Sequence, residues 1–150
     1  MADDVLIELD LPPRPESVSV ARLVVGSLAL ADPSFDEERT SDLRLAVSEA
    51  CTNAMLAQAV VDDSRPIELR YRVSAASIEV SVRDRAGGFD LDAAQRVADL
   101  TDPKRLEYEG GLGIPLIKLL ADEAEFRRLE DGTEVVMTFG PESPTGRLVG

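Results

Sequence analysis

The sequence contains no histidine in its 150 residues, and it has a single cysteine, Cys51. Without histidine the chain cannot form a Ser-His-Asp or Cys-His catalytic arrangement, a histidine-ligated zinc site or a phospho-accepting histidine. A lone cysteine cannot form a disulfide within the chain, so nothing points to an oxidising compartment. Acid–base chemistry is therefore left to Asp, Glu, Lys or Tyr side chains.

Long apolar runs and positive charge are also scarce. No run approaches a membrane span, and residues 1–10 lack the basic region and apolar core of a signal peptide, so we expect a cytoplasmic protein with no membrane association. Lys and Arg number 16 against 29 Asp and Glu, a net charge of −13. Direct nucleic-acid binding needs clustered positive charge and is not expected. A single bound nucleotide or a basic protein partner stays compatible with this charge.

The remaining composition is that of a globular protein, with 44% hydrophobic and 30% charged residues. A chain of this length is large enough for one domain with a core of its own. We therefore expect a single domain over residues 1–150, with a loose tail from about residue 141.

Polarity patterns predict the order of the secondary-structure elements. Strands are expected at 5–11, at 67–75, at 77–84 and on both sides of a turn at 130–133. Helices are expected at 17–30, from 35 or 36 to 61, within 85–95 and after a glycine-rich turn within 111–123. Residues 99–110 have no clear period and are expected to form a loop. This order predicts an α+β fold, a two-layer sandwich with helices on one face of a mostly antiparallel sheet.

The long helix carries a carboxylate and an amide, Glu49 and Asn53, one turn apart. They share a line with Asp42, Ala46 and Ala57, and small residues beside two polar groups leave room for a ligand. One group could then face a metal and the other a reacting hydroxyl or water; alternatively, the pair only widens the exposed face. Two other stripes are expected: an apolar one of Leu43, Val47, Ala50 and Ala54, and a solvated one of Ser41, Arg44, Ser48 and Thr52.

Three further stretches carry ligand-binding residue types. Asp84 ends a strand and could accept a hydrogen bond from an exocyclic amine, with Gly88 nearby to let the backbone approach a flat ring. Backbone N–H groups ahead of the last helix could cradle a phosphate. That glycine-rich stretch is Gly110, Gly111, Leu112 and Gly113. The hydroxyl of Thr133, at the start of the last strand, could be structural or could contact a ligand.

Taken in order, these stretches resemble the GHKL-type ATP-binding fold of gyrase, MutL and histidine kinases. Their order and spacing are most similar to the bacterial anti-sigma factor serine/threonine kinases of the RsbW/SpoIIAB type. The segment "LRLAVSEACTNA" is very close to the N-box of that family. The resemblance extends from about residue 5 to 140.

The resemblance implies a role for each of these positions. Glu49 would be the general base and Asn53 the Mg²⁺ ligand, in a site that binds ATP. Asp84 would bind the adenine amino group, Gly88 would line the adenine pocket and Thr133 would lie near the adenine contact. The glycine-rich stretch 110–113 would cradle the phosphates, and residues 99–110 would form the ATP lid.

The same resemblance implies an anti-sigma factor that sequesters a sigma factor and phosphorylates a STAS-domain anti-anti-sigma protein, and it allows a homodimer. Three positions depart from the family pattern. Ala86 replaces the first glycine of Asp-x-Gly-x-Gly, Ala57 stands where many members have histidine, and Glu109 stands where some have arginine. Lys104 or Arg105 would then have to supply a cation to the phosphates. The alternative is a non-catalytic, degenerate module that binds a regulatory protein.

Overall fold

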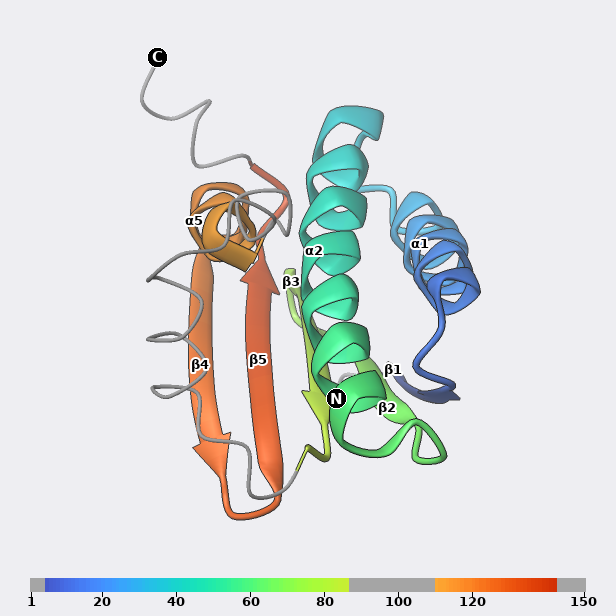
Figure 1. Ribbon diagram of the computed structural model, residues 1–150. Helices are drawn as coiled ribbons and strands as arrows, with labels where there is room; N and C mark the ends of the chain where they lie inside the picture. Colours follow the sequence, from blue (N-terminus) through green and yellow to red (C-terminus); the bar gives the residue numbers. More distant parts are fainter. Residues whose placement is uncertain (1–4, 87–109, 143–150) are drawn as a thin grey trace.

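The computed structural model describes residues 5–86 and 110–142 (Figure 1). The strands are β1 (Val5–Leu11), β2 (Ile67–Ser74), β3 (Ser77–Asp84), β4 (Glu123–Leu129) and β5 (Gly132–Phe139). The helices are α1 (Pro15–Leu30), α2 (Glu37–Asp62) and α5 (Gly110–Leu120). The predicted helix within 85–95, the loop 99–109, Gly88 and most of the expected tail lie outside these residues.

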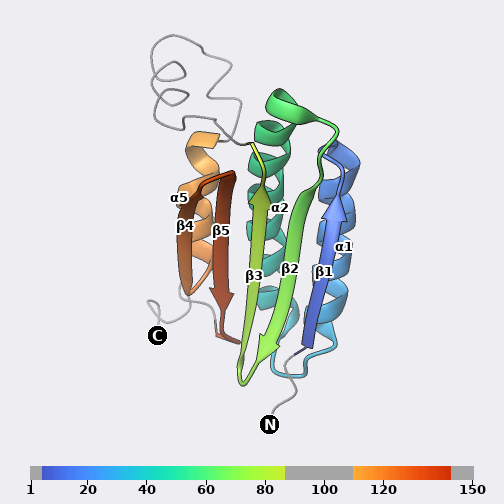
Figure 2. The same cartoon turned by 90° about the horizontal axis from the view of Figure 1, so that it is seen from below.

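The strands form one sheet in the order β1-β2-β3-β5-β4, and every neighbouring pair is antiparallel. The described helices all lie on the same face of this sheet (Figure 2). The predicted α+β sandwich is therefore confirmed. Because β3 and β5 are neighbours, the end of β3 and the start of β5 meet at one end of the molecule.

Helix starts follow the local sequence. The side chain of Asp36 caps α2 by accepting a hydrogen bond from the backbone N–H of Arg39 at 2.8 Å. Proline at a first helical position needs no hydrogen-bond acceptor, so α1 begins at Pro15 and not at the predicted residue 17. The predicted glycine turn before the last helix is wrong, because Gly110 already begins α5 and the glycines form its first turn.

The core lies between the sheet and α2. Residues of β2, β3 and β5 that face the helices are buried, as are Leu43, Val47, Ala50 and Ala54 on α2. The apolar stripe is therefore confirmed. The stripe predicted to be solvated is only partly so: Ser41 is exposed, but Arg44, Ser48 and Thr52 are half-buried. Arg44 lies against Gly26 because α1 packs beside α2.

One buried arginine, Arg39, connects three elements at the end of the molecule where α2 begins. The guanidinium of Arg39 donates to the main-chain oxygens of Leu120 at 2.7 Å and Gly140 at 2.8 Å. It also pairs with Asp42 at 3.1 Å and Asp122 at 3.0 Å. This single side chain ties α2 to the end of α5 and to the end of β5.

Candidate functional site

Asp84 occupies the last position of β3 and is 6% exposed. Its Oδ1 accepts hydrogen bonds from the backbone N–H of Ala86 at 3.1 Å and of Thr133 at 3.3 Å. Thr133 is also the residue opposite Asp84 in the β3–β5 ladder. The structure thus brings Asp84 and Thr133 together as the sequence predicted, but the contact is made by the main chain of Thr133.

The two oxygens of the Asp84 carboxylate have different surroundings. Burial raises its pKa, and the hydrogen bonds from Ala86 and Thr133 only partly oppose that effect. Among residues 5–86 and 110–142, no group donates a hydrogen bond to the second oxygen, Oδ2. A carboxylate oxygen without such a donor is suited to accept a hydrogen bond from a ligand amine.

Glu49 and Asn53 are both half-buried on α2, whereas Ala50 and Ala54 beside them are fully in the core. The Oε2 atom of Glu49 is shielded from solvent. The two polar side chains therefore lie at the boundary of the buried face of the helix and do not belong to a fully solvated stripe. Both side chains are partly exposed, as are Ser48 and Thr52 on the neighbouring stripe.

The glycine-rich first turn of α5 lies beside the part of α2 that carries Glu49 and Asn53. Helices α2 and α5 pack together and run in opposite directions, with Arg39 bound to the main chain of Leu120 (Figure 2). Ten residues of helix rise about 15 Å, which is the length from Arg39 to Glu49 and also from Leu120 back to Gly110. The first turn of α5 therefore lies near the turn of α2 that carries Glu49 and Asn53.

The first turn of α5 contains Gly110, Gly111, Leu112 and Gly113. The N–H groups of a first helical turn have no acceptor within the helix, and the helix dipole adds partial positive charge there. An anionic group such as a phosphate suits this position. The N–H groups predicted to cradle a phosphate belong to this first helical turn, and that role stays a prediction.

Two residues of this end of the molecule were missed in the sequence. Gly132 lies so close to β3 that a Cβ atom on it would be 2.0 Å from the main-chain oxygen of Asp84. Gln58 is fully buried and contacts the backbone just after Asp84. One signal was present for Gln58: it stands four residues after Ala54, so a polar residue falls on the apolar stripe.

Asn53 is the only predicted metal ligand, and the protein supplies little else. In the described part of the chain, no group of three or more His, Cys, Asp or Glu side chains could hold a metal ion. Mg²⁺ is commonly bound by one or two protein oxygens together with substrate phosphates and water. The amide oxygen of Asn53 is one ligand of the kind that such a metal accepts.

Cys51 takes no part in such a site. It is completely buried on α2, and burial raises the pKa of its thiol to about 12. The thiolate is the reactive form of cysteine, and it is negligibly populated at neutral pH with such a pKa. The cysteine next to the predicted motif is a core residue.

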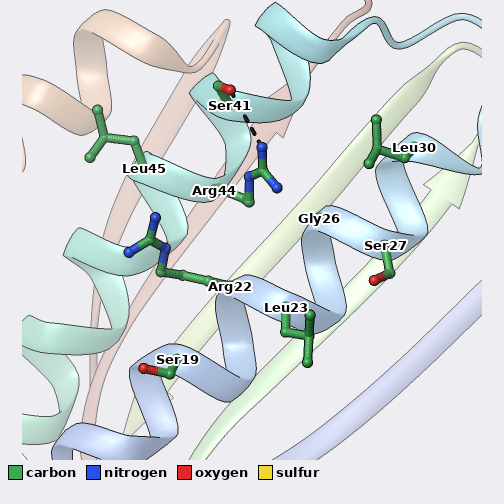
Figure 3. Close-up of a pocket in the computed structure, with 9 residues that line it drawn as sticks. All are labelled: Ser19, Arg22, Leu23, Gly26, Ser27, Leu30, Ser41, Arg44 and Leu45. Atoms are coloured by element: carbon green, nitrogen blue, oxygen red, sulfur yellow. Dashed lines mark hydrogen bonds between the residues drawn. The ribbon is translucent and has the colours of Figure 1, made fainter.

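A separate hollow of about 590 Å³ lies on the outer side of the helical layer, between α1 and α2 (Figure 3). It is lined by Ser19, Arg22, Leu23, Gly26, Ser27, Leu30, Ser41, Arg44 and Leu45. None of the predicted site residues is among them, so this groove is not the site that the motifs describe. Six of its lining residues belong to α1 and three to the first half of α2.

The family model for histidine kinase-like ATPase domains matches residues 11–139. Serine-protein kinase RsbW of Bacillus subtilis is 33% identical over 135 residues, which cover 88% of this chain and 83% of that protein. Serine-protein kinase RsbW of Bacillus pumilus is 34% identical over 138 residues, covering 89% of this chain and 84% of that protein.

Among solved structures, the fold is similar to that of the RsbU and RsbW domains of a protein from Mycobacterium tuberculosis. The TM-score is 0.62 at 20% identity, and the match covers 93% of this chain and 33% of the longer one. Within residues 5–86 and 110–142, no helix has the length and apolar character needed to cross a membrane.

Proposed function

Since the chain belongs to the histidine kinase-like ATPase domain family, and within it to the RsbW serine-protein kinases, we propose that it binds ATP and transfers the γ-phosphoryl group to a protein serine or threonine. The observation that carries this proposal is Asp84. Its buried carboxylate has one oxygen fixed by two backbone N–H groups and the other available to an adenine amino group.

Each end of a bound nucleotide has its own residues in this proposal. Asp84 holds the adenine, and the N–H groups of the first turn of α5 face the phosphates. The amide oxygen of Asn53 holds Mg²⁺, which supplies charge neutralisation at the phosphates when bound. Gly88 and residues 99–109 lie outside the described residues, so their roles at the adenine pocket and as a lid stay predictions from the sequence.

Glu49 acts on the protein substrate. Its carboxylate orients the attacking hydroxyl and takes the proton as the oxygen bonds to the γ-phosphorus. The bond from that phosphorus to the bridging oxygen breaks, and ADP leaves with the electron pair. Phosphoryl transfer depends mainly on positioning and electrostatic stabilisation, so a single rigid helix that carries both Glu49 and Asn53 suits the reaction.

The biological substrate is proposed to be a STAS-domain anti-anti-sigma protein, and the second partner a sigma factor that the same protein sequesters. The similarity to proteins named RsbW supports this part of the proposal. Phosphorylation would release the antagonist and leave the kinase able to hold sigma. A homodimer and a cytoplasmic location remain predictions from the sequence.

Nucleotide binding is tested by calorimetric titration with ATP and ADP, with and without Mg²⁺, on the wild type and on Asn53→Ala. We expect micromolar binding that requires Mg²⁺ in the wild type and is lost in Asn53→Ala. The absence of binding at millimolar nucleotide would reject the kinase and favour the degenerate module, which the departures at Ala86 and Glu109 motivate.

Phosphotransfer is tested with Glu49→Gln and a STAS-domain protein as the acceptor. Removal of a general base typically reduces the rate by a factor of about 10² to 10⁴. ATP affinity should stay within about twofold of the wild type, because Glu49 contacts the acceptor hydroxyl in this proposal. Full phosphotransfer by Glu49→Gln would show that Glu49 has no such role.

A further inference from the structure

Gln58 connects α2, which carries Glu49 and Asn53, to the backbone that follows β3, where Asp84 is proposed to bind adenine. It lies on α2, five residues after Asn53, and is 0% exposed. Its Oε1 accepts a hydrogen bond of 2.6 Å from the backbone N–H of Arg85, the residue that follows Asp84. Its Nε2 donates to the main-chain oxygen of Asp62 in the last turn of α2, at 2.9 Å.

The backbone that Gln58 binds is the backbone that orients Asp84. Arg85 stands between Asp84 and Ala86, and the N–H of Ala86 donates to the Asp84 carboxylate. The side chain of Arg85 is itself held by Glu68 of β2, with contacts of 2.8 and 2.6 Å. Arg85 is therefore fixed at both its main chain and its side chain, and the main-chain contact comes from α2.

We propose that Gln58 is a positioning residue for nucleotide binding: by fixing Arg85 to α2, it sets the place of the Asp84 carboxylate relative to Glu49 and Asn53. This inference rests on the proposed function and names a determinant of its preference for adenine. A helix is rigid over five residues, so the contact fixes the distance between Asn53 and the backbone next to Asp84.

A glutamine amide is the side chain that satisfies both backbone groups at this point. It provides one acceptor for the Arg85 N–H and one donor for the Asp62 C=O. Asparagine is one methylene shorter and cannot span the same gap without movement of the backbone. Methionine has a similar length but leaves the Arg85 N–H without its acceptor, whereas the Asp62 oxygen keeps the Arg65 N–H at 3.3 Å.

The test compares two ligands in the presence of Mg²⁺: ATP, and purine riboside triphosphate, which lacks the 6-amino group. Their dissociation constants are measured by calorimetry for the wild type, Gln58→Met and Gln58→Asn. We expect both variants to bind ATP about tenfold more weakly and the analogue within about twofold of the wild type. The preference for the amino group then falls by about fivefold or more in both.

Two controls separate positioning from general damage. Val47→Ala removes a buried side chain of α2 that contacts neither Arg85 nor Asp62, and it should lower the thermal midpoint without changing the ligand preference. Gln58→Glu keeps the acceptor for the Arg85 N–H and should retain most of the preference. If Gln58→Met does not fold, Gln58→Asn carries the test.

Each other outcome overturns the inference. Unchanged ATP affinity in the Gln58 variants would show that Asp84 holds its place without Gln58. An equal loss for both ligands would show that Gln58 supports the pocket in general and not the adenine contact. Loss of preference in Val47→Ala as well would make it a stability effect. Failure of folded wild-type protein to bind ATP would reject the proposed function, and this inference with it.

Discussion

One buried polar side chain holds each end of α2 to its neighbours, and the two side chains differ in charge and in the groups that they bind. At the start of the helix, Arg39 is 1% exposed, binds two carboxylates and two main-chain oxygens, and stacks 5.1 Å from the centre of the Phe139 ring. Near the other end, Gln58 carries no charge and binds two main-chain groups. The Arg39 end lies away from the proposed site and the Gln58 end lies at it.

The difference indicates that Arg39 mainly stabilises the fold, whereas Gln58 mainly positions Asp84. Arg39 bonds to residues 81, 83 and 101 positions away, so it joins α2 to two distant segments, the end of α5 and the end of β5. Such a network resists opening of that end. The Gln58 end instead retains a buried carboxylate, Asp84, whose pKa is raised by burial, which reduces stability; in the proposed function this carboxylate binds the adenine.

The largest expected effect is on stability at the Arg39 end. Arg39→Met removes the guanidinium that binds Asp42, Asp122 and two main-chain oxygens, although Asp122 keeps the N–H of Gly140. Removing one partner of a buried ion pair costs about 3 kcal/mol or more, and urea unfolding should show a loss of that size. The ATP affinity of the folded protein should stay within about twofold. A large loss of affinity at full stability would contradict the proposed role of Arg39.

Arg39→Lys serves as the control for charge. A lysine ammonium keeps the charge but cannot form the planar, multiply directed contacts of a guanidinium. We expect it to recover only part of the stability that Arg39→Met loses. Complete recovery would mean that charge alone, and not the set of directed hydrogen bonds, fastens this end.

The next effect compares two glycines at opposite ends of β5. A Cβ atom at position 132 would lie 2.0 Å from the main-chain oxygen of Asp84, whereas one at Gly140 would lie 3.1 Å from the side chain of Asp122. Backbone cannot give way as a side chain can, so Gly132→Ala should lose about 2 kcal/mol and ATP affinity together. Gly140→Ala should lose less stability and no affinity, as unfolding curves and calorimetry would reveal.

A smaller effect is expected from the charge of Asp84. Because burial places its folded-state pKa above the ordinary value of 3.8, the folded protein holds a proton that the unfolded chain has lost. The free energy of unfolding therefore falls as pH rises from 3.8 through the raised pKa of Asp84. Above that pKa the whole destabilisation caused by the buried charge is present. Asp84→Asn should have the higher melting temperature at neutral pH, and the difference should vanish below pH 3.8.

The same variant should lose ATP affinity, since an amide whose oxygen faces Ala86 and Thr133 presents N–H groups to the adenine amine. Thermal melts across this pH range and calorimetry at neutral pH measure the two effects. A variant that is both less stable and fully able to bind ATP would contradict both halves of the argument.

Much of the fold was predictable because its signals are local. The strand boundaries 5–11 and 77–84 follow from alternation within a few residues, and the structure reproduces them. The glycines at the start of α5 were misread as a turn, since glycine favours turns in isolation and only packing against α2 decides for a helix.

The site was predictable where a motif named its residues and not where tertiary pairing creates the contact. Asp84 and Thr133 were expected to be neighbours, and their main chains meet through the β3–β5 ladder. Gln58 and Arg85 are 27 positions apart, and nothing local joins a helix residue to a particular backbone N–H on a strand. The closeness of Gly132 to Asp84 likewise depends on strand register.

The smallest expected effect concerns Ala86, where the family pattern has glycine. Ala75 is the one non-glycine residue of the described segments with a positive φ, so Ala86 does not occupy the left-handed region that favours glycine. Ala86→Gly should therefore lower stability by about 0.5–1 kcal/mol, because glycine gives the unfolded chain more freedom. Nucleotide affinity should not rise. A tenfold tighter Kd for ATP would mean that the buried Ala86 methyl group obstructs the adenine, and that Gln58 positions a pocket which is only partly open.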